Sequence, residues 1–329
     1  MITTKEIPKI VLHLHLDGSV DITTMYQWLQ EDGYNYSIEQ VKKLVQVDQS
    51  CRDLNEYLTK FSLPCQLLQV KERLETATYL LFKKLSLENV IYAEVRFAPS
   101  KHLSLGLSYD EVVTAVINGM SKAKKRYQIE GGILLCCMRD NTYFDNMKTI
   151  DIAKKYLNKG VCGIDLAGSE TIYPTENFKH IFYYAKKLHI PFTIHAGEAA
   201  GSDSIMSALN FGTARLGHGV KCIDNKMLMD KILEKKVLLE ICVISNYQTE
   251  AIKEKHPIED LYRYGIKVSI NTDNDTVSNT NIVDEYNYIL STTNMNIEDL
   301  IKCNYDSISY IFAEEKINEK LYQELKKIM

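Results

Sequence analysis

Eight short apolar runs recur along this chain, and segments with helical periodicity separate them. The runs occupy residues 9–16, 90–98, 131–139, 160–168, 191–198, 213–220, 237–243 and 267–273. Most are almost continuous in Val, Ile, Leu and Cys, which is typical of parallel strands covered on both faces. Strand–helix alternation repeated eight times predicts an α/β fold, the closed (β/α)8 or TIM barrel.

The segments between the runs support this fold. Helices are predicted at 66–87, 109–127, 178–188 and 226–234. Ser108 precedes Glu111 by three residues, which is the spacing of a capping box at a helix start. An open, doubly wound sheet is the competing α/β fold. It would require a glycine-rich phosphate loop after the first strand, but His-Leu-His-Leu-Asp-Gly stands there.

Two long segments predict additions to the barrel. Residues 20–88 form a long first connection, rich in helical pattern, which would lie over the C-terminal mouth as a lid. Residues 281–329 predict two or three further helices that close the outside of the barrel. Because there is no Pro/Gly/Ser-rich linker, and barrels commonly exceed 250 residues, residues 1–329 are interpreted as one domain.

Polar residues that can hold a metal stand at the C-terminal ends of four runs. His13 and His15 are two apart in the first run, so both imidazoles should leave the same face of a strand. His195, His218 and Asp273 end later runs, and active sites of this fold gather at that end of the barrel. Imidazoles with a carboxylate are typical of a catalytic metal site, whereas structural zinc usually has cysteine ligands. Zinc is the favoured ion, with iron or cobalt as alternatives.

The surroundings of these residues refine the prediction. The fourth run, 160–168, contains no lysine that could carry a bridging carbamate, which favours one metal ion over two. Glu198 follows His195 by three residues, in His-Ala-Gly-Glu. This short turn would bring the carboxyl beside a substrate, where partial desolvation raises its pKa and equips it to deliver a proton.

Composition limits the partners. The net charge of −4 leaves no basic face for nucleic acid, so a small-molecule substrate is expected. The chain starts without an apolar leader and contains no run long enough to span a membrane, which predicts a cytoplasmic protein without a membrane partner. Its eight cysteines lack Cys-x-x-Cys spacing and are expected to be reduced. The pattern is compatible with a monomer and does not determine the oligomeric state.

Four ordered motifs resemble a known family. His13-Leu-His-Leu-Asp-Gly-Ser19, Ile194-His-Ala-Gly-Glu198, Leu216-Gly-His-Gly219 and Asn271-Thr-Asp273 are similar to the signature segments of the adenosine deaminases. Residues 54–61, 92–99, 163–170 and 239–246 also look like this family, in its order. The resemblance covers nearly the whole chain. It implies zinc-dependent hydrolytic deamination of adenosine and 2′-deoxyadenosine to inosine and deoxyinosine, with release of ammonia.

The resemblance also implies a metal set. His13, His15, His195 and Asp273 match the positions at which the family binds one zinc ion per chain.

The remaining roles that the resemblance implies concern the purine nucleoside. Glu198 would protonate N1 of the ring, and His218 would orient the attacking water and stabilise its charge. The backbone of Gly168 would meet N3, Asn274 would face N7, and Asp17 would bind the ribose 5′-hydroxyl.

Two departures from the family pattern and three alternative functions remain open. Asn274 stands where animal members have a second Asp. An amide can donate to N7 without being protonated, so the change is compatible with deamination. It does weaken the assignment of adenosine over other 6-aminopurine substrates. Val243 replaces a Pro that commonly follows Cys242, and only a local backbone effect is expected. The alternative substrates are adenine, whose deaminases carry Glu at the place of Asp17, and 6-amino-6-deoxyfutalosine. A catalytically inactive nucleoside-binding homologue is the alternative from another class.

Other side chains receive supporting roles. Glu94 and Arg96 are predicted to form a buried ion pair below the site. Phe61, Leu63 and Leu67 are candidates for an apolar wall over the purine, with packing in the core as an equal alternative.

Two polar pairs complete the predictions. Ser245 and Asn246 follow the seventh run and are expected to orient the substrate or its lid, while His102 and His256 are assigned structural or surface roles.

Overall fold

The eight predicted strands are all present in the computed structural model, which describes residues 2–48 and 50–328. Each observed strand lies within its predicted run, except that the third begins one residue earlier. The strands are β1 (Lys9–His15), β2 (Val90–Phe97), β3 (Glu130–Met138), β4 (Val161–Ala167), β5 (Thr193–Ala196), β6 (Arg215–His218), β7 (Leu238–Ile241) and β8 (Val268–Ile270).

The strands form a barrel with two weak seams. Strands β1 to β4 and β5 to β8 make two four-stranded sheets, in each of which every strand runs parallel to its neighbour. A single bridge between Ile164 and Phe192 joins β4 to the start of β5. At the other seam Asp273 donates its amide to His13 and accepts the amide of His15, at 3.1 and 2.7 Å. The (β/α)8 prediction is therefore confirmed, and one seam lies directly at the candidate metal ligands.

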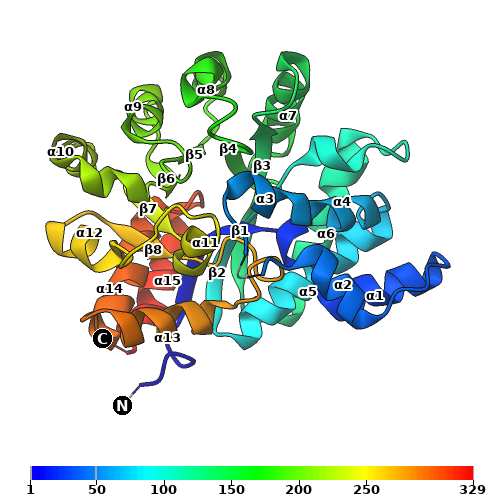
Figure 1. The fold of residues 1–329 in the computed structure, drawn as a ribbon, viewed down its shortest axis with the longest axis horizontal. Coiled ribbons are helices and arrows are strands. Elements are labelled where there is room, and N and C mark those ends of the chain that lie inside the picture. Colours follow the sequence, from blue (N-terminus) through cyan, green and yellow to red (C-terminus); the bar gives the residue numbers. More distant parts are fainter. Residues whose placement is uncertain (1, 49, 329) are drawn as a thin grey trace.

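Helices surround the strands (Figure 1). The first connection contains α1 (Ile22–Glu31), α2 (Ile38–Val45), α3 (Leu54–Leu58), α4 (Ser62–Leu67) and α5 (Lys71–Leu87). Later connections contain α6 (Tyr109–Arg126), α7 (Tyr143–Tyr156), α8 (Lys179–Lys187), α9 (Ser202–Phe211), α10 (Lys226–Glu234), α11 (Val243–Gln248) and α12 (Ile258–Tyr264). The capping box at Ser108 is present at the start of α6.

The helix predicted over 66–87 is two helices. Helix α4 ends at Leu67, and extended backbone at Val70 precedes α5. The Gln69 side chain donates to the carbonyl oxygens of Cys65 and Lys101, both at 2.7 Å. A side chain thus satisfies one of the carbonyl groups that the end of α4 leaves without a partner in the helix.

The first connection reaches the mouth of the barrel, as predicted for a lid. Leu54 and Tyr57 of α3 pack with Val277, and the Tyr57 hydroxyl lies 2.7 Å from Ser278 Oγ. Leu63 and Leu67 pack in the main core and do not line the cavity described below, so for these two residues core packing, the alternative to a wall over the purine, is observed.

Three helices follow β8: α13 (Ile282–Thr292), α14 (Ile297–Ser307) and α15 (Glu315–Lys326). Leu321 and Leu325 of α15 pack with Ile10, Leu12 and Leu238. These residues lie in the first half of β1 and at the start of β7. Helix α15 therefore covers the N-terminal end of the barrel instead of its outside. The opposite, C-terminal end stays available for a site.

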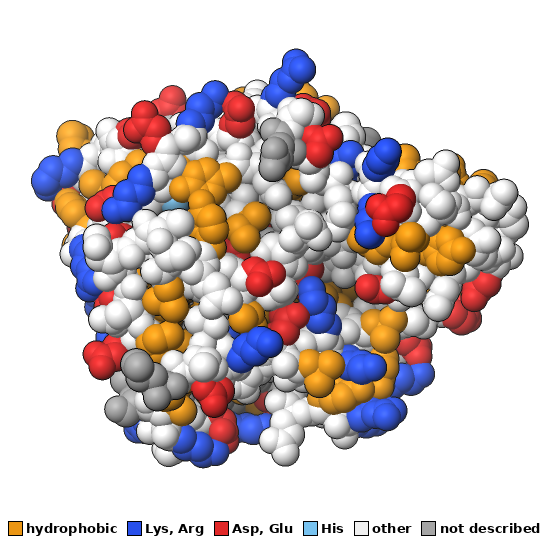
Figure 2. Space-filling model, turned by 60° about the horizontal axis from the view of Figure 1, so that its bottom comes forward, with side chains coloured by type: hydrophobic (Ala, Val, Ile, Leu, Met, Phe, Trp, Pro, Cys, Tyr) orange, Lys and Arg blue, Asp and Glu red, His pale blue; other side chains and the backbone are white. Residues whose placement is uncertain are grey.

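The surface carries both signs of charge. On the face drawn in Figure 2, Lys and Arg side chains are interspersed with Asp and Glu, and small groups of apolar side chains lie between them. Such mixing is typical of globular protein surfaces. Within residues 2–48 and 50–328, no helix is long and apolar enough to cross a membrane.

Candidate active site

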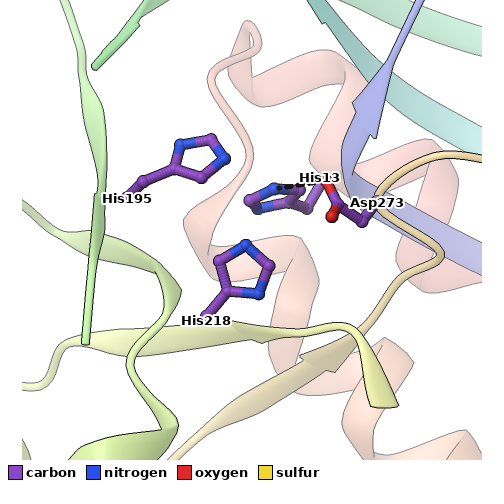
Figure 3. A group of neighbouring side chains, drawn as sticks. All are labelled: His13, His195, His218 and Asp273. Atoms are coloured by element: carbon purple, nitrogen blue, oxygen red, sulfur yellow. Dashed lines mark ion pairs between the residues drawn. The ribbon is translucent and has the colours of Figure 1, made fainter. Parts of the chain in front are cut away.

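The predicted metal-binding residues converge at the C-terminal end of the barrel. His13, His195, His218 and Asp273 point toward one another (Figure 3), and each offers a ligand atom within 4.8 Å of the others. His15 lies at the edge of this group, with its Nε2 atom 3.3 Å from His195 Nε2 and 3.4 Å from Asp273 Oδ1. All are buried except His15, whose side chain is 11% exposed.

Local backbone irregularities aim these side chains. The pairing of β1 with β2 shifts register between Val11 and Leu14, which indicates a bulge beside His13. Asn271 Oδ1 accepts the amides of both Leu12 and His13, at 2.7 and 3.1 Å, and so fills the gap in the ladder.

His218 and Asp273 have φ values of 60° and 64°. Left-handed backbone at non-glycine residues is strained and often marks functional positions. Here the left-handed backbone occurs at two of the converging residues. One stands at the C-terminal end of β6 and the other in the loop after β8.

The donor set fits a divalent cation. His13 Nδ1 lies 2.9 Å from Glu240 Oε2, and His195 Nδ1 lies 2.9 Å from Asp165 Oδ2. Each carboxylate accepts the Nδ1 proton, so the Nε2 lone pair of each imidazole faces the shared centre. Among the described residues His13 Nε2 has no hydrogen-bond partner, and it lies 3.3 Å from Asp273 Oδ1. Converging lone pairs and a carboxylate repel one another unless a cation lies between them.

Arg96 links the two carboxylates that orient these imidazoles. Its guanidinium donates to Asp165 at 3.0 Å and to Glu240 at 2.8 Å, and all three side chains are fully buried. Burial opposes ionisation of both carboxyls, but the neighbouring positive groups hold their pKa values well below the usual range. The predicted pair of Glu94 with Arg96 is wrong, because Glu94 pairs with Arg215 across the barrel at 2.6 Å.

Glu198 lies beside the imidazole cluster. Its side chain is 3% exposed, and its Oε2 atom is 3.5 Å from His218 Nε2. Burial, together with the negative charge of Asp273, raises the pKa of Glu198 to about 8. The carboxyl is therefore protonated near neutral pH, as an acid catalyst must be.

A second carboxylate holds the loop that carries Glu198. Glu170 accepts the backbone amides of residues 197–200, at 2.6 to 3.1 Å, and the hydroxyl of Ser204. Sequence reasoning missed this role, because Glu170 appeared only as the end of a family-like segment. A carboxylate that binds consecutive amides has no sequence signal of its own.

A cavity of about 570 Å³ opens above the cluster. Asp17, Gly168 and Asn274 line it, together with Glu198 and His218. Burial raises the pKa of Asp17 to about 6, so this carboxyl is mainly ionised at pH 7 and can accept a hydrogen bond. Its Oδ1 atom has no partner within the part of the chain that the structure describes.

Two glycines shape this wall. A Cβ atom on Gly18 would lie 1.8 Å from Asn274 Oδ1, so only glycine lets the amide approach the loop that follows β1. Gly168 has φ +104°, a conformation that other residues rarely adopt, and its backbone lines the cavity.

The first connection supplies the apolar part of the wall. Leu54, Tyr57, Leu58 and Phe61 line the cavity, and the Phe61 ring centroid is 6.4 Å from that of His15. An apolar wall opposite a few convergent polar groups is the usual form of a site for a small aromatic ligand.

Comparison with known proteins gives a consistent result. The family model for adenosine deaminase matches residues 8–328. The adenosine deaminase of Haemophilus ducreyi is 38% identical over 323 residues, covering 95% of this chain and 94% of the relative. That of Clostridium perfringens is 36% identical over 321 residues, covering 96% and 97%.

A solved structure agrees over the same length. The Arabidopsis protein ADAL, crystallised with GMP, has a TM-score of 0.89 at 27% identity, covering 99% of this chain and 98% of that one. On the match of the family model and of these full-length relatives, the chain belongs to the adenosine deaminase family.

Proposed function

We propose that this protein catalyses the hydrolytic deamination of adenosine and 2′-deoxyadenosine, with one zinc ion held by His13, His15, His195 and Asp273. Family membership supports the reaction. The observation that carries it is the position of a protonated, buried carboxyl, that of Glu198, in the same cavity as the converging metal ligands. Imidazole and carboxylate ligands favour zinc among the available ions.

The chemistry divides between the metal and the protein. When bound, a zinc ion lowers the pKa of a coordinated water so that a nucleophile is available near neutral pH. Glu198 donates its proton to N1 of the purine, which makes C6 electrophilic. His218, 3.5 Å from Glu198, orients the attacking water on the same side of the cluster.

The cavity wall orients the nucleoside. Asp17 accepts a hydrogen bond from the ribose 5′-hydroxyl, the backbone of Gly168 meets N3, and the Asn274 amide donates to N7. None of these contacts depends on the 2′-hydroxyl, so deoxyadenosine is accepted as well. A free base would leave the buried Asp17 oxygen without a partner, which disfavours adenine.

An absorbance assay of adenosine, adenine and 6-amino-6-deoxyfutalosine, with and without a chelator, tests the proposal. Adenosine should react fastest, and the chelator should abolish the rate until zinc is restored. Adenine clearly outrunning adenosine would overturn the substrate assignment. Bound metal without ammonia release from any aminopurine would support an inactive homologue.

Replacement of His13 should remove the metal. We expect His13→Ala to lose most of its zinc, because its Nε2 lone pair is one of those converging on the centre, and to lose deamination with it. Zinc content by atomic absorption after dialysis provides the measurement. His180→Ala, at an exposed position, is the matched control and should keep its zinc. Unchanged zinc in His13→Ala would exclude this residue as a ligand.

Replacement of Glu170 should loosen the acid without removing the metal. Glu170→Gln loses one acceptor oxygen and places an amide NH2 against backbone donors, so we expect kcat to fall by about 10- to 100-fold with zinc retained. Steady-state kinetics and zinc content check this. The exposed residue Glu176 provides the control Glu176→Gln. A normal kcat with a normal melting temperature would remove Glu170 from the positioning role.

A further inference from the structure

A chain of hydrogen bonds leads from His218 to Asn246 and His256, neither of which lines the cavity. His218 Nδ1 lies 2.9 Å from Asn246 Nδ2, and Asn246 Oδ1 lies 3.1 Å from His256 Nε2. The chain ends at the backbone, where the Ile258 amide is 3.2 Å from His256 Nδ1. All four residues are buried, so water does not compete for these bonds.

The backbone amide decides the direction of every bond in this chain. A backbone N–H can only donate, so His256 Nδ1 must accept from Ile258. Burial lowers the pKa of His256 to about 3, so the ring is neutral and carries its single proton on Nε2. That proton is donated to Asn246 Oδ1, which turns the amide NH2 group toward His218. His218 Nδ1 therefore accepts, and the proton of a neutral His218 ring is on Nε2.

We propose that Asn246 and His256 are positioning residues that hold His218 in its Nε2-protonated form. In this form His218 presents an N–H donor to the water that attacks the purine, and its Nε2 has no lone pair to offer to a metal. The kinetic part of this proposal rests on the proposed deaminase function. The tautomer itself follows from the hydrogen-bond chain alone.

The neighbouring imidazoles have the opposite arrangement. His13 and His195 donate from Nδ1 to Glu240 and Asp165, which leaves lone pairs on their Nε2 atoms. His218 has an amide donor, not a carboxylate, at Nδ1. Within the described residues its Nε2 atom has no hydrogen-bond partner. The partner at Nδ1 thus divides closely grouped histidines into metal ligands and a hydrogen-bond donor.

Nitrogen NMR of the zinc-loaded protein tests the tautomer directly. Long-range ¹H–¹⁵N spectra distinguish a protonated ring nitrogen from one with a lone pair, and a His218→Gln spectrum assigns the His218 signals. We expect a lone pair on Nδ1 and a proton on Nε2 of His218. A proton on Nδ1 of His218 would overturn the proposal, whatever the activity of the protein.

Two variants test the consequence. Asn246→Asp keeps the shape but accepts at both ends, so His218 must donate from Nδ1; we expect kcat on adenosine to fall about 100-fold, with KM changed less than about threefold and zinc content unchanged. His256→Gln keeps a donor for Asn246 Oδ1 and should stay within about fivefold of the parent kcat. Asn118→Asp, at an exposed position on α6, controls for the added charge.

The outcomes separate the hypotheses. Full activity in Asn246→Asp, or equal losses in Asn246→Asp and His256→Gln, would contradict the positioning role. Failure of the unmodified protein to deaminate adenosine would instead contradict the proposed function, and the NMR result would still decide the tautomer. If Asn246→Asp does not fold, the spectrum of the unmodified protein decides the proposal.

Discussion

Glu198→Gln should lower kcat for adenosine by about 10²- to 10⁴-fold, the usual contribution of a general acid, while zinc content and KM remain close to those of the parent. Glutamine has the same shape but no acidic proton for N1 of the purine. The side chain is 3% exposed, and within the described residues its Oε1 atom has no hydrogen-bond partner. Within the described residues the substitution therefore removes no hydrogen bond made by Oε1, and a loss of kcat would report the missing proton.

The pH profile gives this prediction a second readout. In the proposed reaction the reactive form of Glu198 is protonated, and burial raises its pKa in the free protein to about 8, so the parent kcat/KM should fall as the pH rises through about 8. The Gln variant should lack this loss. Glu254→Gln, at an exposed position, should behave like the parent. A near-normal rate in Glu198→Gln would remove the residue from the acid role.

The barrel was predictable because its signals are local. Apolar runs of strand length and helical periodicity reflect burial of each element, which a sequence records residue by residue. The spacing of His13 and His15 predicted that both side chains leave one face of β1, and both lie in or beside the group that could hold a metal; a bulge in β1 and the Asn271 side chain also contribute to their direction.

Partners across the barrel were not predictable in the same way. Glu94 and Arg96 are neighbours on β2 and looked like one ion pair, yet each pairs with residues more than 60 positions away. Which carboxylate meets which guanidinium depends on how strands from distant parts of the chain are arranged around the interior.

Hydrogen-bond direction was equally hidden in the sequence. The role of His256 depends on which of its two nitrogens meets a backbone amide, and residue identity alone does not record that. The sequence suggested only a structural or surface role for it, and a substrate or lid role for Asn246. The proposed metal ligands and the proposed hydrogen-bond donor His218 are all histidines. Only the partner of each ring nitrogen in the folded protein distinguishes their roles.

Arg96→Met should be the most destabilising of the substitutions considered for this protein. Arg96 donates to Asp165, Glu240 and the carbonyl oxygen of Leu12, and it is completely buried. Removing one partner of a buried ion pair typically costs about 3–5 kcal/mol, because a charge is left without compensation. Glu240 keeps Arg215 at 2.8 Å, whereas the only ion-pair partner left to Asp165 among the described residues is His195.

The variant should therefore lose both folding stability and zinc affinity, and separate measurements report the two losses. Denaturant unfolding should report the loss of stability, and competition with a chelator should report zinc affinity reduced by about 10- to 100-fold, because Asp165 and Glu240 orient two of the proposed ligands. Arg126→Met, at an exposed position on α6, is the control and should leave both unchanged. Normal stability and normal zinc affinity in Arg96→Met would show that the buried pairs are not needed.

Acidification should distinguish a charge effect from a packing effect in Arg96→Met. In the parent the folded-state pKa values of Asp165 and Glu240 are depressed, so their ionised forms contribute stability that is present above the unfolded pKa and is lost as the pH falls toward the folded values. In the variant, burial without Arg96 raises the pKa of Asp165, so its protonated form is favoured in the folded state. The stability difference between parent and variant should then shrink as the pH is lowered from 7 to about 5. A difference that stays constant over this range would assign the loss to packing around the missing guanidinium and not to uncompensated charge.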